Sequence, residues 1–315
     1  MDGKNLISLA DLSPEHTREL LDVAALLKAE VKAGHYRPLL AGKTLALLFQ
    51  KPSLRTRVSF DVGMAQLGGR TVYLSPEEVQ LGKRESVADV ARVLSRYVDV
   101  IVARTFAHGD VELLARHASV PVVNGLSDFS HPCQALADYL TIYERLGRLA
   151  GVRLAYVGDG NNTANSLVFG GAKLGVSLVV ASPSGYGIGR EVLAKAREAT
   201  ARFGGQITLT ESPAEAVRGA DVVYTDVWTS MGQEDEVERR HADFAGFQVN
   251  ARLLALAAPG ALVMHDLPAH RGEEITDDVI DGPQSVVYDQ AENRMHAQKA
   301  VLALLLGATP FREVG

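Results

Sequence analysis

The chain has 315 residues, of which 47% are hydrophobic and 22% are charged, and its formal net charge is −6 at pH 7. This length predicts two domains, because one domain usually takes roughly 100–200 residues. The acidic balance excludes a broad nucleic-acid or anionic-membrane surface, since both partners require a basic face. Any anion site must therefore be a local concentration of arginine.

Cysteine content and the amino-terminal segment indicate the cellular compartment in which we expect the protein. The single cysteine, Cys133, excludes an internal disulfide and a thiolate zinc cluster. The first residues lack a charged start followed by an apolar core, so we expect no signal peptide. No apolar run approaches the ~20 residues of a membrane helix. We therefore expect a cytoplasmic protein without a membrane partner.

Predicted strands and helices alternate along the chain. Ser13-Pro14-Glu15 is typical of a helix start, with a capping hydroxyl, a first-turn proline and an acid near the positive end of the dipole. The apolar run 44–49 predicts a buried strand. Further strands are predicted at 71–74, 98–103, 120–123, 153–157, 177–180, 207–209, 222–225 and 262–264. Helices are predicted at 86–97, 134–146, 162–174, 190–203 and 290–306.

This alternation predicts an α/β protein with two parallel-sheet domains and helices on both faces of each sheet. Glycines between 147 and 151 mark a boundary, so we assign 1–147 to the first domain and 151–289 to the second. We expect the C-terminal helix, within 290–315, to cross back to the first domain. Ligands of open α/β sheets gather at the carboxyl ends of the strands, so the residues that follow each strand are the site candidates.

Three segments after strands of the first half are rich in anion-binding groups. Lys51-Pro-Ser-Leu-Arg-Thr-Arg57 follows the first buried strand and runs into a helical segment. Such a junction directs backbone N–H groups at one point, and arginine pairs with phosphate oxygens through two hydrogen bonds. Arg104 ends a later strand, and His131 and Gln134 lie three apart at a helix start, where they could hydrogen-bond one carbonyl. Surface ion pairs, capping and packing are the alternatives.

The second half offers groups suited to an amino acid. Gly158-Asp-Gly-Asn-Asn162 matches a dinucleotide loop only in part, because Thr163 stands where the third glycine belongs. Its asparagines could instead hold an amino-acid backbone, and Asp226 could accept from an ammonium group. Ser230-Met-Gly232 and the charged stretch 233–240 could form a mobile lid, with a surface loop as the alternative. The spacing of His265 and His270 is unspecific, and we expect no metal.

In their joint order these motifs resemble those of the ornithine carbamoyltransferases, over almost the whole chain. The motifs are Ser53-Leu-Arg-Thr-Arg57, Arg104-Thr-Phe, His131-Pro-Cys-Gln134, Asp159-Gly-Asn-Asn162, Asp226 with Ser230-Met-Gly232, and His265-Asp-Leu-Pro268. The resemblance implies a homotrimer without a cofactor. It also implies transfer of the carbamoyl group of carbamoyl phosphate to the δ-amine of L-ornithine, which gives L-citrulline and phosphate.

The resemblance also implies roles for individual residues. Carbamoyl phosphate would be held by Ser53, Leu54, Arg55, Thr56, Gln80, Arg104, His131, Pro132, Cys133, Gln134, Leu267 and Arg294, with Gln80 reaching the donor of a neighbouring subunit. Ornithine would be held by Asn162, Asp226, Ser230 and Met231. The catalytic groups would be Arg55, Thr56, Arg104, His131 and Asp266.

Asp266 departs from the family pattern, which has cysteine at this position. An ionised Asp266 would repel the donor phosphate and favour the charged, non-nucleophilic ammonium of ornithine. We therefore expect lower activity, or activity shifted to higher pH, than with cysteine. Alternatively, Asp266 assists proton removal, supports another acceptor, or is a neutral change.

Several other functions stay open. The chain could be a carbamoyltransferase for aspartate, N-acetylornithine or putrescine, although Asp159 and Asp226 favour an amine over aspartate. It could be a nicotinamide-binding dehydrogenase, against which the broken glycine pattern counts. It could also be a donor-binding protein impaired by Asp266. The sequence leaves the direction of the reaction, toward arginine synthesis or breakdown, and any assembly beyond a trimer undetermined.

Overall fold

The computed structural model describes residues 5–230 and 232–308. The chain forms two compact units, the first made of Met1–Leu140 with Asn293–Gly315 and the second of Thr141–Glu292. Among the described residues, no helix is both long and apolar enough to cross a membrane. The limits of the carbamoyl phosphate-binding and ornithine-binding domains, at 147, 151 and 289, stay a prediction.

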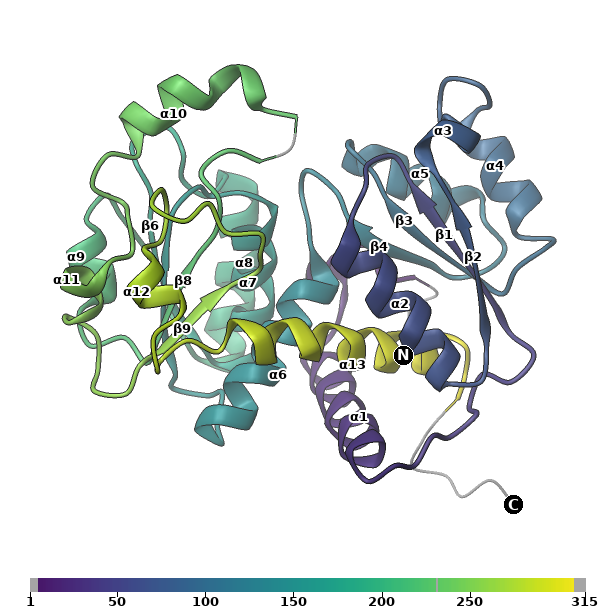
Figure 1. Cartoon of the computed structure of the whole chain (residues 1–315), viewed down its shortest axis with the longest axis horizontal. Helices are drawn as coiled ribbons and strands as arrows, with labels where there is room; N and C mark the ends of the chain where they lie inside the picture. The colour runs from purple at the N-terminus through teal and green to yellow at the C-terminus, as the bar shows by residue number, and fades with distance from the viewer. Residues whose placement is uncertain (1–4, 231, 309–315) are drawn as a thin grey trace. The chain divides into compact units, whose positions relative to one another are not determined.

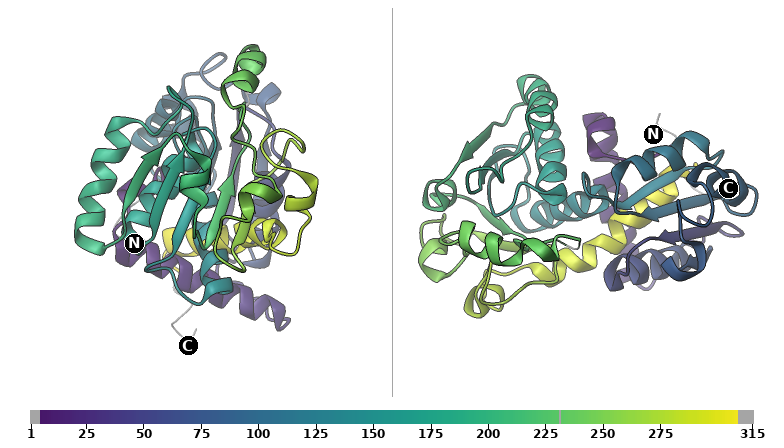
Figure 2. Two further views of the ribbon diagram at one scale, coloured as in Figure 1. Left: turned by 90° about the vertical axis from the view of Figure 1, so that its left-hand side faces the viewer. Right: turned by 90° about the horizontal axis from the view of Figure 1, so that it is seen from above.

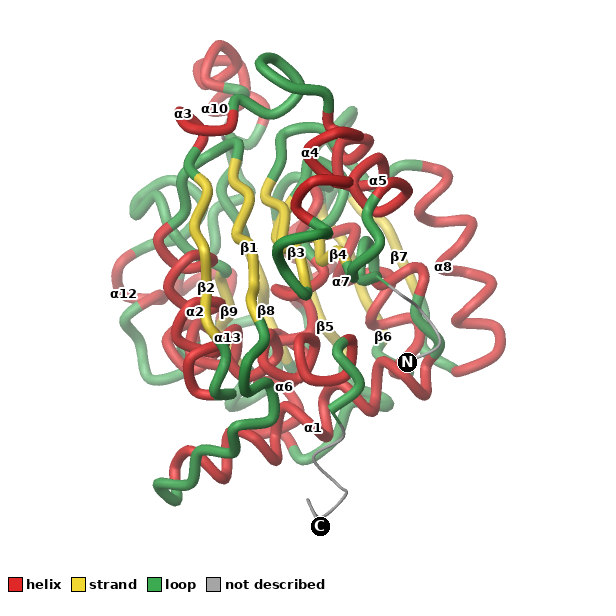
Figure 3. The backbone as a smooth tube through the Cα atoms, turned by 90° about the vertical axis from the view of Figure 1, so that its right-hand side faces the viewer, coloured by secondary structure: helices red, strands yellow, loops and turns green. Residues whose placement is uncertain are grey.

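The sheet of the first unit has four parallel strands in the order β2-β1-β3-β4, which lie side by side in Figure 3. The strands are β1 (Thr44–Phe49), β2 (Arg70–Leu74), β3 (Val100–Arg104) and β4 (Val122–Leu126). Every residue of β1 and β3 is buried. Strands covered on both faces lose the alternation of apolar and polar residues, which explains their unbroken apolar sequences.

Helices cover this sheet on both faces. Alternate residues of the central strands, such as Leu48 and Ile101, pack with α4 (Val87–Leu94) and α5 (His108–His117). Because successive side chains of a strand point to opposite faces, Leu47 and its neighbours in register face the other side. The unit also contains η1 (Leu9–Asp11), α1 (Pro14–Lys32), α2 (Leu54–Gln66), α3 (Pro76–Val79) and the start of α6 (Pro132–Leu146).

The second unit is built on five parallel strands in the order β7-β6-β5-β8-β9. The strands are β5 (Arg153–Val157), β6 (Ser177–Ala181), β7 (Ile207–Thr210), β8 (Val222–Thr225) and β9 (Leu262–His265). The helical segments are α7 (Asn162–Leu174), α8 (Arg190–Phe203), α9 (Pro213–Val217), η2 (Glu234–Glu236), α10 (Val237–Asp243), α11 (Ala251–Leu254) and α12 (Asp277–Ile280). In the left-hand view of Figure 2, the strands lie between the teal helices and the yellow-green segments.

Both sheets reverse their strand order at one point. In the first unit the reversal lies between β1 and β3, where Phe49 pairs with Arg104 at the carboxyl ends. In the second unit it lies between β5 and β8, where Val157 pairs with Thr225. Right-handed crossovers that leave such a point in opposite directions diverge and open a crevice for ligands. Each unit therefore has one preferred place for a binding site.

Helix α13 (Val287–Leu305) begins in the second unit and belongs to the first unit from Asn293 onward (Figure 1). Within the first unit, Lys28 Nζ donates to Asn293 Oδ1 at 2.7 Å, and Lys299 Nζ donates to Gln66 Oε1 at 3.0 Å. The two parallel-sheet α/β units and the C-terminal helix that returns to the first of them confirm the predicted fold class.

Candidate active site

The first turn of α2 follows directly from the carboxyl end of β1. Ser53 caps this helix, and its Oγ accepts a hydrogen bond from the backbone N–H of Thr56 at 3.2 Å. Leu54 is the first helical residue, and its side chain is exposed. Backbone N–H groups at a helix start have no partner within the helix, and they lie at the positive end of the dipole. This turn therefore has the local geometry of an anion site.

Two arginines converge on the hydroxyl of Thr56. Arg104, the last residue of β3, donates from Nη1 to Thr56 Oγ1 at 3.4 Å. Arg294, on α13, donates from Nη2 to the same oxygen at 2.9 Å. All three side chains are buried. Two buried guanidinium groups at one neutral oxygen concentrate positive charge, which favours a bound anion there.

His131 belongs to the same charged neighbourhood. Burial lowers its pKa well below the ordinary value, and the charges of Arg294, Arg104, Lys51 and Arg55 lower it further. The imidazole is therefore neutral at physiological pH. A neutral ring can donate one N–H hydrogen bond to a carbonyl oxygen, while the positive charge of the site comes from the arginines.

Gln134 and Cys133 lie in the first turn of α6. Gln134 Nε2 donates to Asp138 Oδ1 at 2.9 Å, and its Oε1 is buried without a hydrogen-bond partner among the described residues. The amide therefore presents an acceptor, which suits an NH₂ group of a ligand better than the carbonyl expected from the sequence. Burial raises the pKa of Cys133 to about 12, so this residue stays a thiol.

Gln80 differs from these buried groups because its side chain is exposed. It ends α3 in the left-handed conformation, with φ 47°, and it is exposed. Its Nε2 donates to Glu77 O at 3.4 Å. A role toward the donor of a second subunit stays a prediction.

In the second unit, Asn161 holds the carboxylate of Asp226. Asn161 Nδ2 donates to Asp226 Oδ2 at 2.7 Å, and the N–H of Val227 donates to Asp226 Oδ1 at 2.7 Å. Asn161 also caps α7, because its Oδ1 accepts from the N–H groups of Thr163 and Ala164. From the sequence, both asparagines are candidates for an amino-acid backbone and the resemblance assigns only Asn162, the first helical residue, to ornithine, so the contact of Asn161 with Asp226 was not predicted. An asparagine directly before a predicted helix is the signal that could have revealed it.

His265 and Asp266 follow at the end of β9. The His265 ring is buried, its Nδ1 accepts from the N–H of Leu267 at 2.9 Å, and its Nε2 lies 2.9 Å from Glu274 Oε1. Since Nδ1 is an acceptor, Nε2 carries the proton and donates a hydrogen bond to Glu274 Oε1. Leu267 has a left-handed φ of 59°, and its peptide bond to Pro268 is cis.

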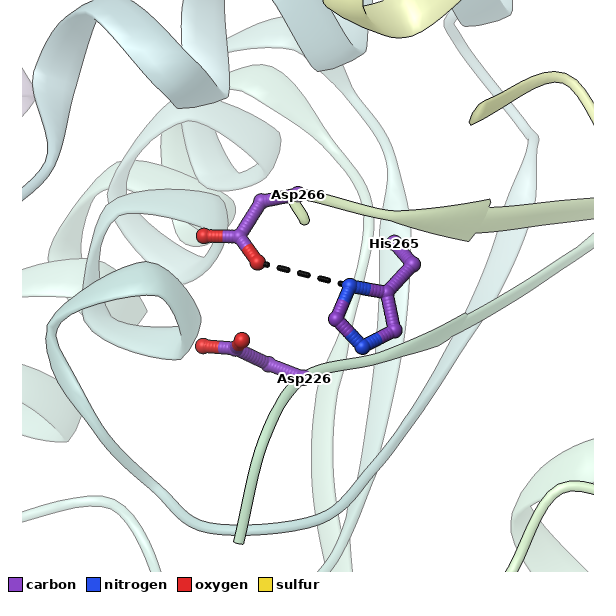
Figure 4. A group of neighbouring side chains, drawn as sticks. All are labelled: Asp226, His265 and Asp266. Carbon is purple, nitrogen blue, oxygen red and sulfur yellow. Dashed lines mark ion pairs between the residues drawn. The ribbon is translucent and has the colours of Figure 1, made fainter. Parts of the chain in front are cut away.

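Asp266 and Asp226 lie near each other. Asp266 Oδ2 accepts from Thr163 Oγ1 at 3.4 Å, and its Oδ1 lies 3.6 Å from His265 Nδ1. A carboxylate oxygen of each aspartate and a ring nitrogen of His265 all lie within 4.8 Å of one another. Figure 4 shows both carboxylates on the same side of the imidazole ring. Two adjacent carboxylates favour a cationic ligand.

A buried ion pair anchors the segment that was predicted as a lid. Arg240 Nη1 donates to Asp159 Oδ2 at 2.8 Å, with side chains only 7% and 11% exposed, and it also donates to Trp228 O at 2.8 Å. Burial raises the pKa of Asp159, although Arg240 opposes that shift. The N–H of Ser230 donates to Gln233 Oε1 at 3.0 Å. Met231 lies outside the described residues, and motion of this segment stays a prediction.

The structure thus gathers the predicted residues into two groups. The first unit contains Ser53, Leu54, Arg55, Thr56, Arg104, His131, Pro132, Cys133, Gln134 and Arg294. The second contains Asn162, Asp226, Ser230 and Asp266, and also Leu267, which the resemblance assigned to the donor.

Comparison with known proteins also divides the chain into two parts, although residues 293–305, with Arg294, fall in the second part there. Residues 4–144 match the family model described as "Aspartate/ornithine carbamoyltransferase, carbamoyl-P binding domain", and residues 150–305 match "Aspartate/ornithine carbamoyltransferase, Asp/Orn binding domain". The ornithine carbamoyltransferase of Pyrococcus abyssi is 58% identical over 98% of this chain and 97% of its own length. The anabolic ornithine carbamoyltransferase of Pyrococcus furiosus is 57% identical over 98% of each chain.

Solved structures of ornithine carbamoyltransferases also match almost the whole chain. The ornithine carbamoyltransferase from Pyrococcus furiosus matches with a TM-score of 0.94 and 57% identity, over 97% of both chains. The anabolic enzyme from Campylobacter jejuni matches with a TM-score of 0.91 and 35% identity, over 96% of this chain and 99% of that one. Both family models and these full-length relatives lead to one conclusion: the chain belongs to the aspartate/ornithine carbamoyltransferase family.

Proposed function

We propose that this chain transfers the carbamoyl group of carbamoyl phosphate to the δ-amine of L-ornithine, releasing L-citrulline and phosphate. The observation that carries the proposal is the convergence of Arg104 and Arg294 on Thr56, at the start of a helix that follows a buried strand. The names of the relatives in Pyrococcus abyssi and Pyrococcus furiosus, both ornithine carbamoyltransferases, support the choice of acceptor.

The first unit supplies the groups that would bind and polarise the donor. The first turn of α2, with Ser53 and Arg55, would hold the phosphate oxygens. Arg104, Thr56 and His131 would donate to the carbonyl oxygen, which gains negative charge as the amine attacks. The neutral imidazole of His131 contributes a hydrogen bond there, and the arginines contribute the charge. Gln134 Oε1 would accept from the carbamoyl NH₂ group.

The second unit supplies an acceptor site. Asp226, held by Asn161 and the N–H of Val227, would pair with the δ-ammonium of ornithine, and Asn162 and Ser230 would hold its α-amino-acid group. After the ammonium loses one proton to solvent, the δ-nitrogen attacks the carbonyl carbon. The bond from carbon to the phosphate oxygen then breaks, and phosphate leaves with the electron pair and takes up the second proton. This balance requires neither a cofactor nor a covalent enzyme intermediate.

An ionised Asp266 would add a second negative charge beside Asp226. Two carboxylates stabilise the ammonium form of a bound amine and so raise its pKa. The acceptor would therefore bind well but need a higher pH to become nucleophilic. This reasoning supports the expectation of an alkaline shift.

The assembly that we propose is a homotrimer in the cytoplasm. One exposed stripe on α2 supports self-association, because Leu54, Val58 and Val62 recur every four residues and are 74%, 48% and 41% exposed. Residues four apart share one helix face, so these side chains form a continuous apolar surface that a second copy could cover. In that assembly Gln80 would reach the donor of the neighbouring subunit.

The direction of the reaction that we propose is toward arginine synthesis. The anabolic name of the Pyrococcus furiosus relative supports this direction.

The activity can be tested with a panel of acceptors. The purified chain is incubated with carbamoyl phosphate and ornithine, N-acetylornithine, putrescine or aspartate, while phosphate and ureido product are both measured. We expect equal amounts of phosphate and citrulline with ornithine. A higher kcat/KM for another amine would assign a different acceptor. Donor binding without turnover would assign a binding protein.

A further inference from the structure

Asp138 lies on α6 one turn after Gln134, and the proposed reaction gives it no role. Its side chain is completely buried, and that of Gln134 is only 1% exposed. Gln134 Nε2 donates to Asp138 Oδ1 at 2.9 Å, a contact along one face of the helix, since residues four apart share a face. A buried carboxylate thus holds the amide of a residue that we assign to the donor site.

This carboxylate decides which end of the Gln134 amide faces Asp138. An amide side chain can turn over, because its oxygen and its NH₂ group are similar in size and shape. An ionised carboxylate only accepts hydrogen bonds, so it pairs with the NH₂ group and repels the amide oxygen. The reversed amide would lose a charge-assisted hydrogen bond and place two acceptors in contact. Asp138 therefore keeps Oε1 on the side of the amide that points away from it.

The oxygen that results is an unused acceptor. Gln134 Oε1 is buried and has no hydrogen-bond partner among the described residues, which costs free energy until a donor reaches it. His131, three residues earlier, lies close enough to Arg294 and Arg104 for their charges to lower its pKa. Residues three apart at a helix start lie on the same side, so Gln134 belongs to this anion site.

A carbamoyl group presents the same ambiguity as an amide. Its oxygen and its NH₂ group have nearly the same size, and only hydrogen bonding tells them apart: the oxygen accepts and the NH₂ group donates. Arg104, Thr56 and His131 would donate to the oxygen. A Gln134 amide that could turn over would bind either NH₂ or a second oxygen at the remaining position, whereas a fixed Oε1 binds only NH₂.

We propose that Asp138 is a positioning residue that makes the donor site selective for a phosphate ligand carrying an NH₂ group, because it holds Gln134 Oε1 ready to accept from that group. The proposal rests on the proposed function and adds the residue that sets its donor specificity. A ligand with oxygen in place of NH₂ would meet Oε1 as acceptor against acceptor. A site built to hydrogen-bond one group rejects analogues that leave its buried polar atoms unpaired.

Two stable analogues test the proposal by binding alone. Phosphonoacetamide carries the carboxamide of the donor, and phosphonoacetate has a carboxylate in its place. Calorimetry gives both dissociation constants for the parent and for Asp138→Asn, whose own amide can accept from Gln134 or donate to it. We expect the ratio of the two constants to shift toward phosphonoacetate at least about tenfold in the variant. Glu144→Gln, at an exposed carboxylate of the same helix, should leave the ratio unchanged.

Gln134→Met separates positioning from charge, because methionine has nearly the size of glutamine but no amide. The loss of the Asp138 charge favours the more anionic phosphonoacetate with or without Gln134. In the Gln134→Met background, Asp138→Asn should therefore shift the ratio at least about fivefold less than in the parent, and this double-mutant cycle isolates the part that passes through Gln134. Asp138→Ser, whose hydroxyl can also donate or accept, should give the same difference. Circular dichroism checks that each variant is folded.

The outcomes separate this proposal from the proposed function. Equal shifts in the two backgrounds, or no shift in either, would overturn the role of Asp138 while the proposed reaction stands. Failure of the parent to bind phosphonoacetamide would instead remove the donor site and, with it, both proposals. Turnover of carbamoyl phosphate by the parent, measured separately, shows which of these cases applies.

Discussion

The amide of Asn161 joins the start of α7 to the carboxylate of Asp226. Its Oδ1 caps the helix through two backbone N–H groups, while its Nδ2 donates to Asp226 Oδ2 at 2.7 Å. One side chain thus both begins a helix and orients the group that would receive the ammonium of the acceptor. These two roles can be separated by mutation.

Asn161→Ser should lower kcat/KM for ornithine by about tenfold to 100-fold while the protein keeps its stability. Serine caps a helix about as well as asparagine, but it lacks the amide donor to Asp226, and one lost charge-assisted hydrogen bond is worth roughly 1.5–3 kcal/mol. Asn161→Ala should lose the same activity and also about 1 kcal/mol of unfolding free energy. Steady-state kinetics and urea unfolding measure both effects. Full activity in Asn161→Ser would show that Asn161 serves only as a cap.

Asp266→Cys should raise kcat/KM for ornithine at pH 7 and move the alkaline-rising limb of its pH profile to lower pH. Removal of a carboxylate beside Asp226 makes the bound ammonium easier to deprotonate, and each pKa unit corresponds to about 1.4 kcal/mol. Asp266→Asn is the matched control, because it removes the charge without adding a thiol. If all three pH profiles coincide, the charge of Asp266 has no influence on the amine.

Arg294→Met should raise the KM for carbamoyl phosphate at least about 30-fold, because it removes a buried, charge-assisted hydrogen-bond donor. The melting temperature checks that the variant is folded. Arg92→Met, at an exposed ion pair with Asp89, is the control and should leave the KM unchanged. An unchanged KM in Arg294→Met would remove α13 from the donor site.

His296 should make the protein less stable in acid. Burial lowers its pKa from 6.5 to about 3, and the charges of Lys299, Lys28 and Lys32 add to the shift. Below pH 6.5 this residue is protonated in the unfolded chain but not in the folded chain. The free energy of unfolding therefore falls as the pH falls toward 3. Each pH unit in that window costs about 1.4 kcal/mol.

The comparison of His296→Gln with the parent tests this linkage. Urea unfolding between pH 6.5 and 4.5 should show a shallower loss of stability in the variant. His35→Gln changes an exposed histidine and should follow the parent. Identical slopes in all three proteins would assign the acid sensitivity to other groups.

Cys133 should resist alkylation in the folded protein. It is buried, and its pKa is raised to about 12, so almost no thiolate exists at pH 8. Iodoacetamide should leave the native chain unmodified and add one carbamidomethyl group in urea, as measured by intact mass. Rapid modification without denaturant would mean that the start of α6 opens readily.

The strands could be predicted from the sequence because most of them are buried on both faces. β1, β5 and β8 begin and end at the predicted residues, and the other strands differ by one to three residues at their ends. Helices α7 and α8 were also predicted with the observed limits. Short helices such as α3, α11 and α12 were missed, because four residues make only one turn and show no periodicity.

The sequence could propose site residues from their position after a predicted strand or at a predicted helix start. Ser53, Arg104 and Asp226 were proposed from strands, because parallel strands bring their carboxyl ends to one edge, and Gln134 was proposed from a helix start. The roles of these residues stay predictions, and the orientation of the Gln134 amide depends on Asp138 one turn later.

By itself, the sequence determined the two α/β units, the order of their strands along the chain and the residues that stand after each strand, because these depend on local apolar patterns. Only the tertiary structure decided that Arg294 meets Thr56, that Glu274 holds His265 and that His241 meets Glu273. These contacts join residues whose partners are chosen by helix packing and loop paths. Such choices depend on the whole fold and leave no periodic signal in the chain.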